Sequence, residues 1–194
     1  MPAFTLLFCA IIVTVFVLDH FFLLPKSARI SLKEKLLTGH NKGRLNRVLR
    51  LDDRKIKKGE VWRLVSSSLL HVGPFHLISN LAAMLIVGFA VEPRLGAVKT
   101  TLCYVVSTLV SGLFMTFVYQ LHEGEGASPG IYGLIAVFAV QALKNGTVLF
   151  SDLPLYALIL LTIYTVCGLF SQKATLFEHL SGFAGGLLIT ALVV

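Results

Sequence analysis

The sequence predicts an all-α membrane protein with six membrane-spanning helices and a long first loop. Of its 194 residues, 56% are hydrophobic and only 14% are charged, about half of the roughly 25% charged residues typical of soluble domains. The mean hydropathy is +0.82, and the charged residues are clustered, which leaves long apolar stretches. A soluble fold could not bury this much apolar surface, so we expect an integral membrane protein.

Six apolar stretches approach or exceed the length that crosses a bilayer, which is about 20 residues for a helix. The first has no basic leader and no small-residue cleavage site, so we expect it to be retained rather than removed as a signal peptide. Glu92-Pro93-Arg94 is expected to form a tight turn after the second span. We expect a single membrane domain over residues 1–194, with spans at about 2–24, 74–91, 100–121, 127–143, 153–170 and 175–194.

The fourth span is too short to cross the hydrocarbon core. About 17 residues rise only ~25 Å, less than the ~30 Å thickness of the core. Its first residues, beginning near Ser128, are therefore expected below the membrane surface in a water-filled depression lined by protein. The second, fourth and sixth spans run in the same direction, so His76, Ser128 and His179 should lie at similar depth near one face.

Ser128 and His179 are the candidate catalytic pair. A hydroxyl and an imidazole within a membrane need polar partners or water, and a serine beside a histidine base is a minimal hydrolytic unit. Ser128-Pro129 also has the pattern of a helix start, with serine at the cap and proline at the first position. The free N–H groups of such a start suit a developing oxyanion, so the two interpretations are compatible.

Glycines on the fourth and sixth spans are expected to bring this pair together. Gly182 and Gly186 form a GxxxG face that lets a neighbouring helix approach closely, and His179 lies one turn before Gly182. The fourth span has its own small-residue stripe, which begins at Gly126. Taken alone, His179 would more often be a structural histidine within the membrane.

Neighbouring polar residues fit an oxyanion site better than a metal site. His76 and Asn80 share one helix face, four residues apart, and both side chains can donate to an oxyanion; polar packing between helices is the alternative. His71 lies five residues before His76, which does not match the H-x-x-x-H spacing of a helical zinc site. No carboxylate is placed to orient His179, so we expect a dyad in which Tyr132 stacks against the imidazole.

The net charge of +7 does not indicate nucleic-acid binding. Thirteen of the seventeen Lys and Arg residues lie between Lys26 and Arg63, where a basic loop beside a membrane faces anionic lipid headgroups. Cys9, Cys103 and Cys167 all lie in apolar stretches, so we expect small core residues rather than a disulfide framework or a metal site.

The sequence resembles the rhomboid family of intramembrane serine proteases. The resemblance covers residues from about Trp62 to Gly186, two-thirds of the chain, and each motif alone is weak, but together and in order they are specific. The matching segments are Trp62-Arg63, His71, His76-x-x-x-Asn80, Glu92-Pro93-Arg94-Leu95-Gly96, Gly126-Ala127-Ser128 with Tyr132, and His179-x-x-Gly182-x-x-x-Gly186.

The resemblance implies a serine endopeptidase that cuts single-span membrane proteins within or beside their helix. Ser128 would be the nucleophile and His179 the general base, while His76, Asn80 and the Ser128 N–H would form the oxyanion hole. No metal or cofactor would be needed. The supporting residues would be Trp62, Arg63, His71, Glu92, Arg94, Gly126, Tyr132, Gly182 and Gly186.

Two positions depart from the family pattern. Pro129 replaces the usual glycine after the serine, and Glu178 replaces the usual small residue before the histidine. These departures support an alternative, a catalytically inactive rhomboid-like binder or escort of membrane proteins, although inactive members lose the serine or histidine and this chain keeps both. A small transporter or metal permease is a third interpretation, for which intramembrane carboxylates are too scarce.

The family implies a multi-pass protein of a bacterial cell membrane, with the active site opening on the non-cytoplasmic side. The charge distribution conflicts with this orientation. Fourteen Lys and Arg residues lie on the first-loop face, against Arg94, Lys99 and Lys144 on the other, and the positive-inside rule would place the first loop in the cytoplasm. The sequence does not indicate the natural substrate or the oligomeric state.

Overall fold

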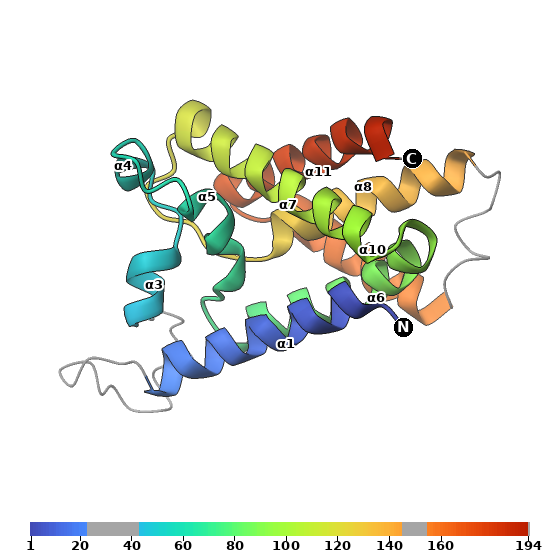
Figure 1. The fold of residues 1–194 in the computed structure, drawn as a ribbon, viewed down its shortest axis with the longest axis horizontal. Helices are drawn as coiled ribbons and strands as arrows, with labels where there is room; N and C mark the ends of the chain where they lie inside the picture. Colours follow the sequence, from blue (N-terminus) through green and yellow to red (C-terminus); the bar gives the residue numbers. More distant parts are fainter. Residues whose placement is uncertain (23–42, 145–154, 194) are drawn as a thin grey trace.

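The computed structural model describes residues 1–22, 43–144 and 155–193 (Figure 1), and these ranges fold almost entirely into helices. Four long helical stretches among the described residues are apolar enough to cross a membrane. The first is Ala3–Phe22, made of α1 (Ala3–Val17) and the π-helix η1 (Leu18–Phe22), and the second is α6 (Pro74–Leu95). The third is Ala97–Tyr119, made of α7 (Ala97–Phe114) and the π-helix η4 (Met115–Tyr119), and the fourth is α11 (Lys173–Val193). The chain is a multi-pass integral membrane protein.

Two shorter apolar helices and a group of small helices complete the described chain. α8 (Ser128–Lys144) and α10 (Leu155–Leu169) are shorter than the four long stretches, as the sequence predicted for the span that starts at Ser128. The part of the first loop that the structure describes folds into α3 (Arg44–Leu49), α4 (Asp53–Ile56), α5 (Arg63–Ser66) and the 3-10 turn η3 (Ser67–Leu69).

The predicted tight turn at Glu92-Pro93-Arg94 is wrong. α6 continues through Pro93 to Leu95, and the chain turns at Gly96, whose φ of 78° favours glycine. The third span therefore begins at Ala97 instead of about residue 100. Pro93 has no N–H to donate to the carbonyl of Phe89, so the last turn of α6 lacks one bond of the helical ladder.

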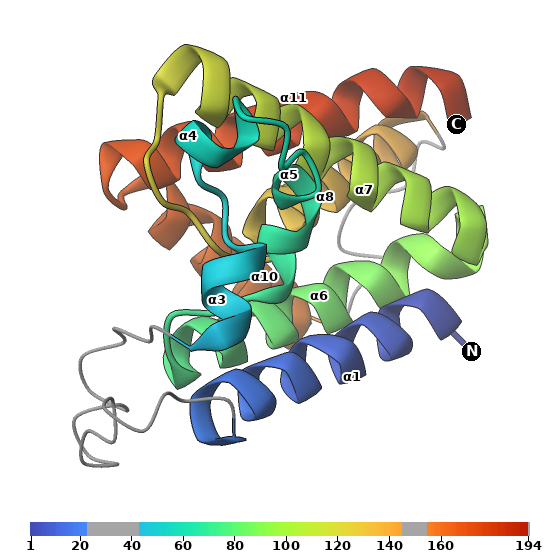
Figure 2. The ribbon, with the colours of Figure 1, turned by 60° about the vertical axis from the view of Figure 1, so that its left-hand side comes forward.

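α8 lies at the centre of the bundle, where it packs against α6, α7 and α11, and α11 also packs against α7 (Figures 1 and 2). α1 lies alongside α6, as Figure 2 shows, with the N-terminus at the far end from the first loop. α10 lies at the edge, where it packs against α6 and α11. Cys9 and Cys103 are buried as predicted, but the prediction is wrong for Cys167, which is exposed on α10 because that helix covers so little of the bundle.

Glycines allow the backbones of α8 and α11 to touch. A Cβ atom at Gly182 would lie 2.3 Å from the backbone oxygen of Pro129, and one at Gly186 would lie 2.3 Å from that of Gly133. No side chain fits at such distances, so helix association here comes from direct backbone packing, as in other small-residue membrane interfaces.

Glu92 ties α6 to the start of α1. The backbone N–H groups of Phe4 and Thr5 donate to its carboxylate at 2.8 and 2.9 Å, and the Thr5 hydroxyl donates at 2.7 Å. These N–H groups belong to the first turn of a helix, which has no acceptors of its own. Glu92 is 4% exposed, so the carboxylate and the helix end satisfy each other where water cannot.

Replacing Glu92 should loosen the docking of α1. We expect Glu92→Gln to lower the free energy of unfolding by about 1.5–3 kcal/mol, the range for hydrogen bonds to a charged group, because the amide replaces one acceptor oxygen with a donor. Denaturant unfolding in a mild detergent measures the change. Glu123→Gln is the matched control, because Glu123 is 61% exposed and forms a surface ion pair with Arg50. Equal effects of the two substitutions would contradict the capping role.

A methyl group at Gly182 should force α8 and α11 apart. Gly182→Ala is expected to destabilise the protein by about 1–3 kcal/mol, the usual cost of overpacking, because the atom it would meet is rigid backbone. Ala184→Val adds bulk to the exposed side of the same helix and serves as control in the same unfolding assay. If both variants unfold alike, the backbone contact does not limit the packing.

Candidate active site

Ser128 and His179 meet at the contact between α8 and α11. The Oγ atom of Ser128 and the Nε2 atom of His179 are 3.0 Å apart, a hydrogen-bond distance. Ser128 is the first residue of α8 and His179 lies in the second turn of α11. Their exposed fractions are 6% and 5%. The sequence predicted this approach, and the contact of Gly182 with Pro129 explains it, since it sets α11 against the first turn of α8.

Tyr132 lies one turn after Ser128 and stacks on the imidazole of His179. The two ring centroids are 4.1 Å apart and the planes are 12° from parallel, as the sequence analysis expected. The Tyr132 hydroxyl donates to the backbone oxygen of Thr165 in α10 at 3.1 Å, so the ring is held at both ends. The Nδ1 atom of His179 faces the backbone of Gly168, and no described residue donates or accepts a side-chain hydrogen bond there.

Asn80 and His76 lie on the α6 side of the pair. The Asn80 amide donates to the backbone oxygen of His76 at 2.8 Å, and its oxygen accepts from the Tyr164 hydroxyl at 3.1 Å. The His76 ring lies against Gly126, where a Cβ atom would be 2.9 Å from Cε1. Gly126 also has a φ of 145°, so both the available space and the backbone conformation favour glycine at this position, two residues before Ser128.

His71 supports the ring of His76 from outside α6. The two imidazoles meet edge to face, with centroids 5.1 Å apart. His71 is 2% exposed and neither ring nitrogen has a hydrogen-bond partner among the described residues. Burial lowers its pKa to about 3, with smaller contributions from His76 and His20, so the ring is neutral at physiological pH and acts here by packing.

Arg63 and Trp62 hold the first loop together rather than contacting Ser128. The buried guanidinium of Arg63 donates to the backbone oxygens of Arg50 and Arg47, each at 2.9 Å, and pairs with Glu60. The Trp62 indole donates to the backbone oxygen of Val48. The Arg94 guanidinium donates to the backbone oxygen of Ala90 within α6. Arg94 and Glu92 both lie near the end of α6, far from His76 at its start.

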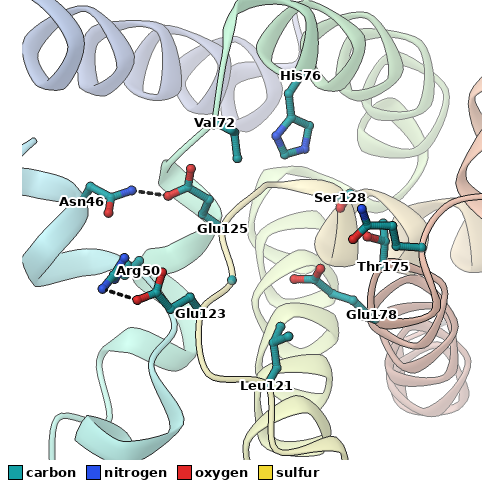
Figure 3. A pocket seen from close by; sticks show the side chains of 13 residues that line it. Asn46, Arg50, Val72, His76, Leu121, Glu123, Glu125, Ser128, Thr175 and Glu178 are labelled. Carbon is teal, nitrogen blue, oxygen red and sulfur yellow. Dashed lines mark hydrogen bonds and ion pairs between the residues drawn. The ribbon is translucent and has the colours of Figure 1, made fainter. Parts of the chain in front are cut away.

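A polar cavity of about 460 Å³ opens onto Ser128 from the first-loop side (Figure 3). Its walls come from α3, the loop before α8, and α11. The Asn46 amide donates to Glu125, and Arg50 pairs with Glu123 at 2.6 Å, as the dashed lines in Figure 3 mark. Burial raises the pKa of Glu125 to about 7, so this carboxyl titrates near neutrality.

A second cavity, of about 500 Å³, reaches the same pair from the side of α6 and α10. Its lining is mostly apolar and includes Ile86 of α6 and Leu160 and Ile163 of α10, together with His179. His76, Ser128 and Thr175 line both cavities. The two cavities therefore meet at the serine.

Several residues that shape this site could not be identified from the sequence. Tyr164 and Gly168, on α10, contact Asn80, Tyr132 and His179, and no local motif marks them. Asn46 and Glu125 lie 79 positions apart, and only the fold pairs them. Within the described residues, no group of three His, Cys, Asp or Glu side chains is placed to hold a metal ion.

The chain is similar in sequence to several known rhomboid-like proteins. The chain is 28% identical to RHOMBOID-like protein 1 of Arabidopsis thaliana over 81% of its own length and 41% of that protein. It is 29% identical to Rhomboid protease GluP of Bacillus subtilis (strain 168), over 70% of this chain and 27% of that protein. Putative rhomboid protease YdcA of the same bacterium is 28% identical, over 92% of this chain and 83% of that protein.

The chain spans about half or less of the length of the plant relatives it matches. The Rhomboid domain itself matches residues 58–194, from the end of the first loop through α11, and so contains both members of the pair. Because this match covers well over half of the sequence, the chain belongs to the rhomboid family, as its motifs indicated.

Proposed function

We propose that the chain is an intramembrane serine protease that hydrolyses peptide bonds in or near the transmembrane segments of single-span membrane proteins. One observation carries the proposal: the Ser128 hydroxyl lies 3.0 Å from the His179 imidazole at the point where a polar and an apolar cavity meet. A serine hydroxyl within hydrogen-bond reach of a neutral imidazole has the geometry of an activated nucleophile.

In the proposed reaction, the Ser128 oxygen attacks the carbonyl carbon of the substrate while His179 Nε2 takes the hydroxyl proton. His179 then returns this proton to the leaving amine, and an acyl-enzyme remains on Ser128. A water molecule from the polar cavity, deprotonated by the same imidazole, attacks the ester, and the imidazole returns that proton to the Ser128 oxygen as the carboxyl product leaves. This chemistry needs a base, an acid and water, and it requires no metal or cofactor.

The oxyanion of the tetrahedral intermediate would be stabilised at the N-terminus of α8. The first N–H groups of a helix lack internal acceptors and carry the positive end of its dipole. Pro129 removes one of these donors, but the Ser128 N–H remains. His76 and Asn80 approach from α6 and would add side-chain donors, each worth roughly 10²–10³ in rate by analogy with other oxyanion holes.

Substrates would enter from the membrane through the apolar cavity between α6 and α10. Its lining suits the hydrophobic residues of a transmembrane segment, and α10 has few buried side chains that oppose a displacement. Water would reach the serine from the other, polar cavity. On this proposal α1, α6, α7, α8, α10 and α11 are the six membrane spans of a rhomboid-like bundle.

The alternative is a non-catalytic member of the family that binds membrane proteins in the same cavities. Its support lies in Pro129, which stiffens the residue after the serine, and in Glu178, which adds a carboxylate beside the histidine. It predicts substrate binding that does not depend on the Ser128 hydroxyl and no turnover.

Removal of either member of the pair should abolish catalysis. A fluorophosphonate probe is expected to label the detergent-solubilised protein, and Ser128→Ala to eliminate labelling. Cleavage of a model single-span substrate should fall at least about 10³-fold in Ser128→Ala and in His179→Ala. Ser181→Ala is the control, because Ser181 lies on α11 and bonds to Ser111 and its own helix. Cleavage that survives in Ser128→Ala would contradict the mechanism.

The proposed orientation places the first-loop face, and with it the polar cavity, outside the cytoplasm of a bacterial cell. Lys58→Cys, introduced into a chain without its natural cysteines, should then react with a membrane-impermeant thiol reagent on intact cells. Lys144→Cys, at the other end of α8, is the control and should react only after lysis. The reverse pattern would show that the basic loop follows the positive-inside rule.

A further inference from the structure

Glu178 brings a carboxylate into the polar cavity that no other side chain neutralises. Glu178 lines the cavity together with Ser128 and His76. Figure 3 shows its carboxylate pointing from α11 into the cavity, with Glu123 and Glu125 on the loop across from it. The other two carboxylates have partners, since Glu123 pairs with Arg50 and Glu125 accepts from Asn46. The Glu178 carboxylate has no side-chain partner among the described residues.

The backbone that carries Glu178 is held firmly. Its carbonyl oxygen accepts from the Ser111 hydroxyl of α7 at 2.9 Å. The next residue is His179, fixed by its bond to Ser128. The carboxylate therefore projects from a fixed point next to the reacting serine, and its position depends little on the loops.

The charge of this cavity is unbalanced. Three carboxylates and one guanidinium line it, and a carboxylate that is removed from bulk water without a partner raises the free energy of the folded state. A cation that entered the cavity would remove that cost and gain the Coulomb attraction. The apolar cavity on the other side of Ser128 has no such charge, because its polar lining is restricted to neutral side chains.

Resting on the proposed protease function, we propose that Glu178 makes the enzyme selective for substrates with a lysine or arginine in the polar segment that adjoins their membrane helix. The scissile bond lies at Ser128, between the two cavities. The apolar helix end occupies the cavity of α6 and α10, and the flanking segment extends into the polar cavity, where its basic side chain meets Glu178.

Binding tests this selectivity without relying on turnover. A model single-span substrate is prepared with Lys, Gln or Glu in the segment adjoining its apolar helix, and its Kd for the Ser128→Ala protein is measured in detergent at low salt, where screening is weak. We expect the Lys substrate to bind about fivefold or more tightly than the Glu substrate, which corresponds to an ion pair at the upper end of the exposed range.

Substitutions of Glu178 should change this preference in a predictable direction. Glu178→Gln keeps the shape and should reduce the ratio to below about twofold, while Glu178→Lys should reverse it in favour of the Glu substrate. Glu123→Gln, which removes a paired carboxylate from the same cavity, is the matched control and should leave the preference for Lys. Equal binding of the three substrates would overturn the proposal. The same loss of preference in Glu123→Gln as in Glu178→Gln would also overturn it.

Turnover separates this inference from the proposed function. If the wild-type protein cleaves all three substrates at the same kcat/KM and binds them equally, the protease proposal stands and the role of Glu178 falls. If it binds with the expected preference but cleaves none, the role of Glu178 stands and the protease proposal falls in favour of a selective binder.

Discussion

The contact between the backbones of α8 and α11 is the constraint on which the site depends. At Gly182 there is no room for a single carbon between α11 and the carbonyl oxygen of Pro129. This separation allows a serine on one helix and a histidine on the other, 51 positions apart, to share a hydrogen bond. Inside a membrane, where no hydrophobic effect drives helices together, packing of this closeness is a main source of association.

Several buried polar groups in this bundle are paired, which removes the cost of their burial. Glu92 satisfies the start of α1, Arg63 satisfies the carbonyls that end α3, and Asn80 bonds to Tyr164 across the cavity. The Ser128–His179 pair differs because water can reach it through the polar cavity. Of the three carboxylates that line the polar cavity, only Glu178 has no side-chain partner among the described residues, and an unpaired carboxylate is tolerable only where a solvent or a ligand can approach it.

The positions of the helices and the approach of Ser128 to His179 could be predicted from the sequence, because both follow from local patterns along the chain. Apolar length located the spans, and glycine spacing indicated which helix faces meet. The sequence prediction failed at Pro93, where α6 continues to Leu95 and the Glu92 side chain is bound to the start of α1 instead of lying in a turn. It could not find Tyr164, Gly168, Asn46 or Glu125, since each acts through a partner on a different element.

Among the described residues no acidic side chain lies beside the Nδ1 atom of His179, and the location of the site explains this. A carboxylate beside Nδ1 would need partners of its own in a low-dielectric region, whereas an aromatic ring orients the imidazole without a charge. The orienting ring is that of Tyr132, whose hydroxyl is bonded to Thr165 of α10. A displacement of α10 that admitted a substrate would break that bond, while the Ser128–His179 contact, which α8 and α11 hold, would remain.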